Sequence, residues 1–187
     1  MSKTFPIKAI MPLIEYGHLE FGENKVQEAV IKWTDLKLSK PNLKLHLIGK
    51  LQTNKVKIAL KLFDYIHSVD SKKLAKKIAD EELKQNKKIK IFLQVNIGDE
   101  KQKSGVIKND ISDLYYYCKN LNLDVVGLMC IPPADKQPEI FFKEMSLLTK
   151  KFNLLELSMG MSADYIEAAK NSSTYLRIGS NIFGKRS

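Results

Sequence analysis

The chain is predicted to be an α/β protein built on a parallel sheet, and two features of the sequence predict this. Short runs of β-branched and other apolar residues alternate with longer amphipathic stretches along all 187 residues, as repeated β-α units require. Several short runs, such as residues 91–95 and 125–129, are apolar almost throughout, which suits parallel strands covered on both faces. The alternation alone allows either a barrel or a doubly wound open sheet.

The predicted elements follow one another with no linker rich in Gly, Ser or Pro, so we expect a single domain over residues 1–187. The short apolar runs predict strands at residues 18–22, 44–49, 65–69, 90–96, 124–130, 154–158 and 174–178. The amphipathic stretches between them predict helices near residues 6–16, 24–37, 53–62, 71–87, 108–121, 136–151 and 163–171.

The chain is rich in lysine, but its charge does not indicate nucleic-acid binding. The formal net charge is +10, and 28% of the residues are charged. The lysines are scattered over predicted helix faces, and aromatic residues are not interleaved with them as a base-stacking surface needs. Only Arg177 and Arg186 supply the guanidinium that phosphate- and base-reading surfaces favour. We therefore expect a solvated basic surface and no nucleic-acid partner.

Membrane, secretory and metal-binding signals are missing from the sequence. No apolar run approaches the length of a membrane-spanning helix, and no secretory signal opens the chain, so we expect a cytoplasmic protein with no membrane contact. Cys118 and Cys130 are too few for a disulfide framework and lack metal-ligand spacing. His18, His46 and His67 lack that spacing too, and His46 is interpreted as a satisfied core residue.

Four motifs stand out along the chain. They are Ser-Lys-Thr-Phe-Pro at 2–6, Phe-Gly-Glu-Asn-Lys-Val-Gln-Glu-Ala at 21–29, Ser-Met-Gly-Met-Ser at 158–162 and Arg-Ile-Gly-Ser-Asn-Ile-Phe-Gly at 177–184. This set resembles the pyridoxal phosphate homeostasis proteins (the YggS/PROSC-like family) from residue 2 to about residue 186. The resemblance implies a (β/α)₈ TIM barrel of the alanine racemase N-terminal domain type, and pyridoxal 5′-phosphate (PLP) as the cofactor.

In such a barrel, functional residues gather at the carboxyl ends of the strands. All four motifs fall at these ends, so they share one rim. The resemblance implies that Lys3 forms a Schiff base with PLP. An amine must be neutral to attack an aldehyde, and burial or a neighbouring cation favours that state. The competing interpretation of Lys3 is an exposed lysine near a chain end.

The segments 158–162 and 177–180 are interpreted as the phosphate site, because barrels commonly bind phosphate with their last two strand-end loops and a helix N-terminus. Hydroxyl groups, glycine backbone amides and the helix beginning near residue 163 would hold the dianion. The residues concerned are Ser158, Gly160, Ser162, Gly179 and Ser180. Ser162 is alternatively a helix N-cap.

Two further residues complete the predicted cofactor site. The resemblance places Arg177 opposite the pyridine nitrogen, where a permanent positive charge disfavours protonation of that nitrogen and makes the ring a poor electron sink. The alternative is a strand-end arginine in a surface ion pair. Asn24 would lie beside the cofactor, or it would cap the second helix together with Gln27.

These residues predict a protein of intracellular PLP homeostasis that buffers or delivers the cofactor without catalytic turnover. PLP-dependent apoenzymes are the candidate recipients, and we expect a monomer. The enzyme alternative is a racemase or decarboxylase of the alanine racemase fold type. Those enzymes resemble this chain in the barrel but add a β-domain that supplies a catalytic tyrosine or cysteine. The chain ends at Ser187, just beyond the last barrel strand, so we expect no such domain.

The sequence departs from the family pattern in two places. Phe5 stands where many members carry a second lysine, and only two residues precede Lys3 where a helix and most of a strand are usual. An eighth strand would therefore be a remnant ending at Lys3. We expect a barrel truncated at the N-terminus and open beside this remnant, less stable and weaker in cofactor binding than a chain extended upstream.

Overall fold

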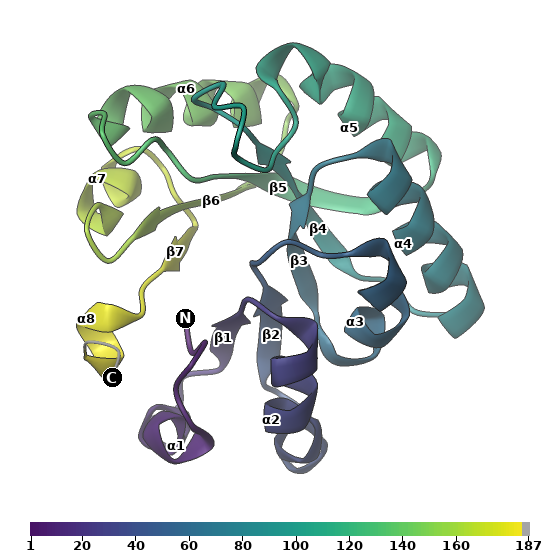
Figure 1. The fold of residues 1–187 in the computed structure, drawn as a ribbon, viewed down its shortest axis with the longest axis vertical. Coiled ribbons are helices and arrows are strands. Elements are labelled where there is room, and N and C mark those ends of the chain that lie inside the picture. The colour runs from purple at the N-terminus through teal and green to yellow at the C-terminus, as the bar shows by residue number, and fades with distance from the viewer. Residues whose placement is uncertain (185–187) are drawn as a thin grey trace.

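The computed structural model describes residues 1–184, which form a barrel of parallel strands surrounded by helices (Figure 1). Each strand pairs with the next one along the chain, so the sheet order is β1-β2-β3-β4-β5-β6-β7. The strands are β1 (Glu20–Glu23), β2 (Lys44–Leu47), β3 (Tyr65–Val69), β4 (Lys90–Val95), β5 (Asp124–Cys130), β6 (Glu156–Met161) and β7 (Tyr175–Arg177).

A helix follows each strand and covers the outside of the sheet (Figure 1). The helices are α1 (Ile7–Glu15), α2 (Val26–Ser39), α3 (Val56–Leu62), α4 (Lys72–Gln85), α5 (Ile111–Asn120), α6 (Pro138–Lys151), α7 (Tyr165–Lys170) and α8 (Ser180–Phe183). Two single turns of 3₁₀ helix, Thr53–Lys55 and Lys108–Asp110, precede α3 and α5. Among the described residues, no helix is long and apolar enough to cross a membrane.

Helix α4 shows how local sequence sets these elements. Its N-cap Ser71 accepts a hydrogen bond from the amide of Leu74 (3.4 Å), and its C-cap Asn86 adopts the left-handed conformation at φ 46°. Between the caps, Leu74 and Ile78 lie on the face that is buried against the barrel. Other helices pack on the sheet in the same way. Trp33 of α2 is fully buried and packs against Phe21 of β1, with ring centroids 5.0 Å apart.

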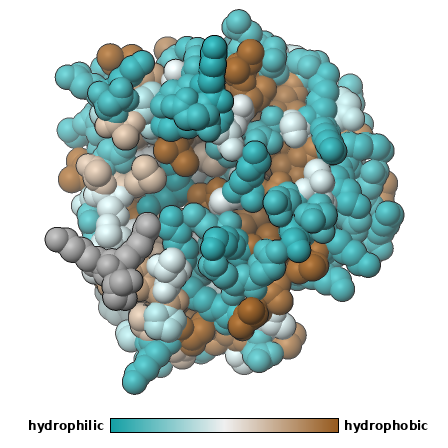
Figure 2. All heavy atoms as spheres, in the orientation of Figure 1, coloured by the Kyte–Doolittle hydropathy of each residue, from teal (hydrophilic) through white to brown (hydrophobic). Residues whose placement is uncertain are grey.

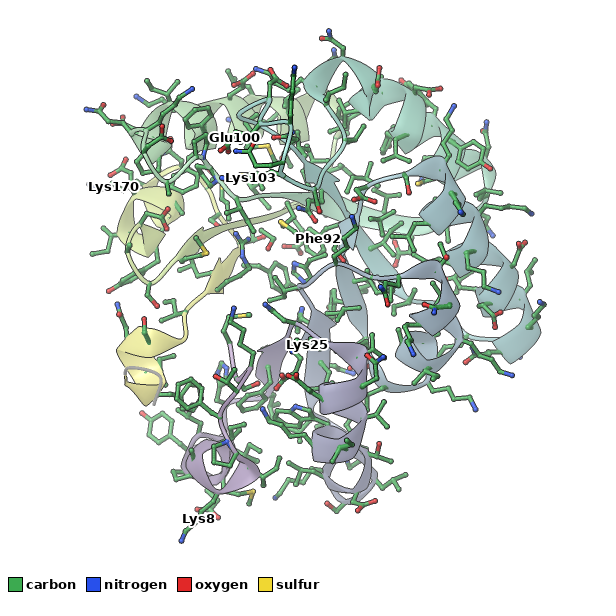
Figure 3. The ribbon with its side chains drawn as sticks, viewed as in Figure 1. Lys8, Lys25, Phe92, Glu100, Lys103 and Lys170 are labelled. Carbon is green, nitrogen blue, oxygen red and sulfur yellow. The ribbon has the colours of Figure 1, made fainter. Side chains whose placement is uncertain are left out.

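Side chains inside the ring show that the sheet curls into a barrel. His46 of β2 and Tyr175 of β7 have ring centroids 5.5 Å apart, and Tyr65 of β3 lies 5.8 Å from Tyr175. These strands are not neighbours in the sheet, so the rings meet across the barrel interior. Figure 3 places Phe92 of β4 near the centre of the ring. The doubly wound alternative is therefore wrong.

The eighth strand expected to end at Lys3 is not formed. Residues 1–3 lie in the gap between β1 and β7 (Figure 1). The amide of Ser2 donates to Gly22 O (2.9 Å), and the amino nitrogen of Met1 donates to Ile178 O (2.7 Å). Within residues 1–184 no strand pairing joins β1 to β7, so the barrel is nearly closed rather than complete, as the sequence predicted.

The other elements follow the predicted order, although several of their bounds differ. The first strand begins at Glu20 because the amide of His18 still bonds to Leu13 O (2.9 Å) at the end of α1. Strand β6 extends to Met161, beyond the predicted 154–158, so part of the Ser-Met-Gly-Met-Ser motif is strand. Helix α8 was not predicted.

Candidate functional site

A cavity of about 630 Å³ opens at the carboxyl ends of the strands, a volume typical of small-molecule sites. Six of the predicted site residues line it: Lys3, Asn24, Ser162, Arg177, Gly179 and Ser180. They come from the N-terminal segment, from the loops after β1 and β6, and from the end of β7 and the residues that follow it. On the face shown in Figure 2, hydrophilic residues surround most of the rim, and hydrophobic residues are visible between them toward the middle.

The N-terminal segment that carries Lys3 is fixed by a buried carboxylate. Glu23 is 1% exposed, and its Oε1 accepts hydrogen bonds from the Ser2 hydroxyl (2.7 Å), Lys32 Nζ (2.7 Å) and Trp33 Nε1 (2.9 Å). Lys32 Nζ also donates to Ser2 O (2.6 Å). Ser2 is therefore held from both its side chain and its backbone, immediately before Lys3.

Asn24 lies against the loop after β2, and this contact requires glycine at position 49. A Cβ at Gly49 would lie 2.1 Å from the backbone oxygen of Asn24, so any other residue would force the two loops apart. Asn24 is not a helix cap: the N-cap of α2 is Lys25, and no side chain caps this helix. The capping interpretation is wrong, and the structure instead places Asn24 on the cavity wall.

The loops after β6 and β7 are joined by hydrogen bonds. The amide of Gly179 donates to Ser162 Oγ (3.3 Å), and Asn181 Nδ2 donates to Ser162 O (3.0 Å). Ser162 is not the N-cap of the next helix, because α7 begins at Tyr165 with Asp164 at the N-cap. The helix expected near residue 163 is thus shorter than predicted, with six residues. Helix α8 begins on the same rim at Ser180.

Ser158 and Gly160 do not line the cavity, although both were predicted to bind the phosphate. Ser158 is fully buried inside the barrel, where its Oγ contacts Arg177 Nη1 (2.9 Å) and His67 Nδ1 (2.9 Å). Gly160 is buried at φ +86°, and a Cβ there would lie 2.5 Å from Ala168 Cβ. The small residue at 160 thus lets α7 pack closely against β6.

Arg177 is a buried cation at the floor of the cavity. It is 6% exposed, and its guanidinium donates to Ser158 Oγ (2.9 Å) and to Cys130 O (2.8 Å). No ion pair to Arg177 occurs within residues 1–184, so the alternative of a surface ion pair is wrong. Burial lowers the pKa of Arg177 from its usual value. A buried guanidinium without a carboxylate partner is costly unless a ligand complements it.

Sequence reasoning missed the loop between β4 and α5. Gln102, Lys103 and Ser104 line the cavity, and Figure 3 shows Lys103 beside Glu100 on this loop. The loop is tied down because Gln94 Nε2 donates to Ser104 O (3.0 Å) and Lys103 forms an ion pair with Glu100 (2.7 Å). Polar residues between two glycines directly after a predicted strand were the available signal.

The cavity wall is strongly cationic. Lys3, Lys50, Lys103 and Arg177 line it, and no aspartate or glutamate does so among the described residues. No tyrosine or cysteine lines it in that part of the chain either. The two cysteines are buried, and burial raises the pKa of the Cys130 thiol to about 12, so this thiol stays protonated and unreactive. No metal-binding group of His, Cys, Asp and Glu occurs within residues 1–184.

His67 makes the stability of the fold depend on pH. Burial, followed by His46 and the Arg177 guanidinium, lowers the pKa of His67 well below its usual 6.5. Tyr65, Tyr175 and the hydroxyl of Ser158 also face this ring. Below pH 6.5 the unfolded chain therefore binds a proton that the native state does not, and this favours unfolding.

We therefore expect the free energy of unfolding to fall as the pH drops below 6.5, with a contribution from His67 of up to about 1.4 kcal/mol per pH unit. Urea denaturation of wild type and His67→Gln over this range measures it. The glutamine variant should lose this part of the slope, and His18→Gln, at an exposed position, should keep it. Equal slopes in wild type and His67→Gln would contradict the assignment.

Fold and site together define a barrel of the alanine racemase N-terminal domain class. The family model described as alanine racemase, N-terminal domain, matches residues 5–187. The alanine racemase of Clostridium difficile 630 shares this fold, with a TM-score of 0.75 over 96% of this chain and 48% of the racemase chain, at 14% sequence identity.

Proteins with higher sequence identity show the family within this class. The pyridoxal phosphate homeostasis protein of Aquifex aeolicus is 38% identical over 99% of this chain and 85% of its own length, and that of Escherichia coli K12 is 35% identical over 100% and 84%. The structure of PipY from Synechococcus elongatus, solved with PLP bound, has a TM-score of 0.89 and 32% identity over 98% of this chain and 90% of that chain. The chain belongs to the pyridoxal phosphate homeostasis protein family.

Proposed function

We propose that this protein binds PLP in the barrel cavity and serves intracellular PLP homeostasis, by buffering the cofactor or delivering it to PLP-dependent apoenzymes. One observation carries the proposal: a cavity of about 630 Å³ is lined by four cationic side chains and, within residues 1–184, by no acidic one. Such a wall selects a small anion. The names of the relatives and the PLP bound in PipY support the choice of PLP.

The residues on the cavity wall fit the three polar parts of PLP. Lys3 supplies an amine for the aldehyde; its Nζ would form a C=N bond to the aldehyde carbon, with release of water. The loops of Ser162 and Gly179, with α8 beginning at Ser180, supply the hydroxyl and backbone amides that suit a phosphate. Arg177 supplies a donor that stays charged, which suits an unprotonated pyridine nitrogen as its acceptor. When bound, PLP supplies an electrophilic aldehyde.

We further infer that the protein has no racemase or decarboxylase turnover of its own. Proton transfer at an amino-acid α-carbon needs a positioned acid or base on each side. Apart from its lysines, the cavity wall holds none of the residue types that usually serve this way, since no tyrosine, cysteine, aspartate, glutamate or histidine lines it among the described residues. A charged Arg177 opposite the pyridine nitrogen would also disfavour protonation of that nitrogen and so make the ring a poor electron sink. Retention of the cofactor, rather than its chemistry, is therefore the proposed role.

The proposal is tested by titrating the protein with PLP and, separately, with pyridoxal, which lacks the phosphate. We expect a new visible absorbance band and saturable binding with PLP, and binding at least about tenfold weaker with pyridoxal, since the phosphate contacts are charge-assisted. Exchange of amino-acid α-protons in deuterated buffer should stay near background. No saturable PLP binding would refute the function; turnover of about 1 per second or more would instead support an enzyme.

Ser162 provides a test of the phosphate loops. Ser162→Ala should weaken PLP binding by roughly 1–2 kcal/mol, the scale of a hydrogen bond to a charged group. Within residues 1–184, Ser162 Oγ accepts a single hydrogen bond, which is long at 3.3 Å from Gly179 N. The apo protein should therefore lose less stability than the complex. Isothermal titration and apo-protein melting measure the two quantities. Full loss of apo stability with unchanged affinity would assign Ser162 a purely structural role.

A further inference from the structure

A chain of hydrogen bonds crosses the barrel interior and ends at Arg177. Beginning at the N-terminal end of the barrel, Glu20 Oε2 bonds His46 Nε2, and His46 Nδ1 bonds His67 Nε2 (2.9 Å). His67 Nδ1 bonds Ser158 Oγ (2.9 Å), which contacts Arg177 Nη1 (2.9 Å). These hydrogen bonds join β1, β2, β3, β6 and β7. Both histidines are buried: His46 is 4% exposed and His67 is 1% exposed.

The groups at the two ends of this series of hydrogen bonds, Arg177 and Glu20, fix the direction of every bond in the series. A guanidinium only donates, so Ser158 Oγ accepts from Arg177. The buried hydroxyl proton then needs an acceptor, and His67 Nδ1 is the other partner of Ser158 Oγ among the described residues. His67 then carries its proton on Nε2 and donates to His46 Nδ1. His46 in turn donates from Nε2 to the Glu20 carboxylate, which only accepts. Both rings are neutral Nε2–H tautomers, and each nitrogen has one partner.

Aromatic side chains hold both rings in the plane that these bonds need. His46 stacks on Tyr65 with ring centroids 4.3 Å apart and an interplanar angle of 9°, and His67 stacks on Phe92 at 4.1 Å and 17°. A 180° flip of either ring would put C–H groups where Nδ1 and Nε2 now lie and would break both hydrogen bonds of that ring at once. The packing and the bond directions therefore reinforce one arrangement.

We propose that Glu20, His46, His67 and Ser158 form a one-directional relay that positions the Arg177 guanidinium toward the cavity. The relay gives Nη1 a fixed acceptor inside the barrel, while Cys130 O holds Nη2. It also links the buried positive charge to the half-exposed carboxylate of Glu20 through polarised groups. These four residues are positioning residues, since among the described residues only Arg177 of the set lines the large cavity.

The arginine end of the relay is measured on the apo protein, so it is independent of PLP. The sequence holds only two arginines and three histidines, so selective ¹⁵N labelling gives few signals. We expect separate Nη1 and Nη2 resonances for Arg177 in wild type, because both nitrogens are held. They should merge through free rotation in Ser158→Ala. The control Thr149→Val removes a buried hydroxyl that bonds only Met145 O and should leave them separate.

The histidine end is read from the same sample at neutral pH. We expect protonated Nε2 and unprotonated Nδ1 in both His46 and His67. An Nδ1–H tautomer in either ring, or merged Arg177 resonances in wild type, would overturn the relay whatever the protein binds.

The consequence for the ligand rests on the proposed function. His67→Leu and Ser158→Ala should each weaken PLP binding about tenfold, the equivalent of one hydrogen bond to a charged group, and should shift the absorbance band of the bound cofactor. His67→Gln, which keeps an acceptor and a donor on one terminal group, should restore both. Wild-type affinity and spectrum in Ser158→Ala would overturn the positioning role. A wild type with the expected tautomers but no PLP binding would refute the function and leave the relay standing.

Discussion

Lys3→Ala is expected to abolish the visible absorbance band that PLP acquires on binding to this protein. The side chain lines the cavity beside the loops of Ser162 and Gly179, and an amine is the group that condenses with an aldehyde. The phosphate and ring contacts do not depend on Lys3, so PLP should still bind without the covalent bond, and its affinity should fall by roughly tenfold or more.

Matched lysine variants make this result specific. Lys8 is exposed on α1 and points away from the barrel (Figure 3), so Lys8→Ala should match wild type in band and affinity. Lys50→Ala and Lys103→Ala remove other amines of the cavity wall and should weaken binding while keeping the band. If the band survives in Lys3→Ala and disappears in either of these two, another lysine holds the aldehyde.

Glu23→Leu is expected to lower the free energy of unfolding by about 3–5 kcal/mol, the range for a broken buried ion pair. The carboxylate is 1% exposed and accepts three side-chain hydrogen bonds. Its loss leaves the Lys32 ammonium, in a side chain only 14% exposed, without an anion. It also frees Ser2, so Lys3 should react less completely with PLP.

Urea denaturation with a double variant separates the two contributions. Glu23→Leu with Lys32→Met removes both charges and should recover a large part of the lost stability, since apolar replacement of a whole buried pair is often neutral. Glu28→Ala breaks the exposed Lys25–Glu28 pair on the same helix and should cost less than about 1 kcal/mol. Equal destabilisation in the single and double Glu23 variants would show that the ion pair is not the cause.

The fold was largely predictable because its signals are local. The strands at 65–69 and 124–130 were predicted to the residue, and the second of them is apolar almost throughout. The end of strand β1 was predicted one residue early, because β1 ends in Glu23 and a charged residue is typical of a loop. Glu23 is buried because it accepts hydrogen bonds from Ser2, Lys32 and Trp33. Helix α8 has four residues, which is too short for a helical period to appear.

The candidate site was predictable where it follows strand ends and unpredictable where it depends on contacts between distant strands. Asn24, Ser162 and Gly179 each follow a strand, so the sequence placed them on one rim, where they line the cavity. Ser158 belongs to the same motif, but it lies within β6 and points to His67 and Arg177. Only the curvature of the whole sheet brings those three side chains together. The spacing of the residues in the sequence does not predict that contact.

The most direct test of the account is to saturate the protein with PLP, reduce it with borohydride and locate the pyridoxyl group by peptide mass spectrometry. Reduction fixes a C=N bond to whichever lysine formed it. We expect the label on the peptide that contains Lys3, with only minor labelling among the other lysines of the chain. A label mainly on Lys50, Lys103 or a lysine outside the cavity would contradict it.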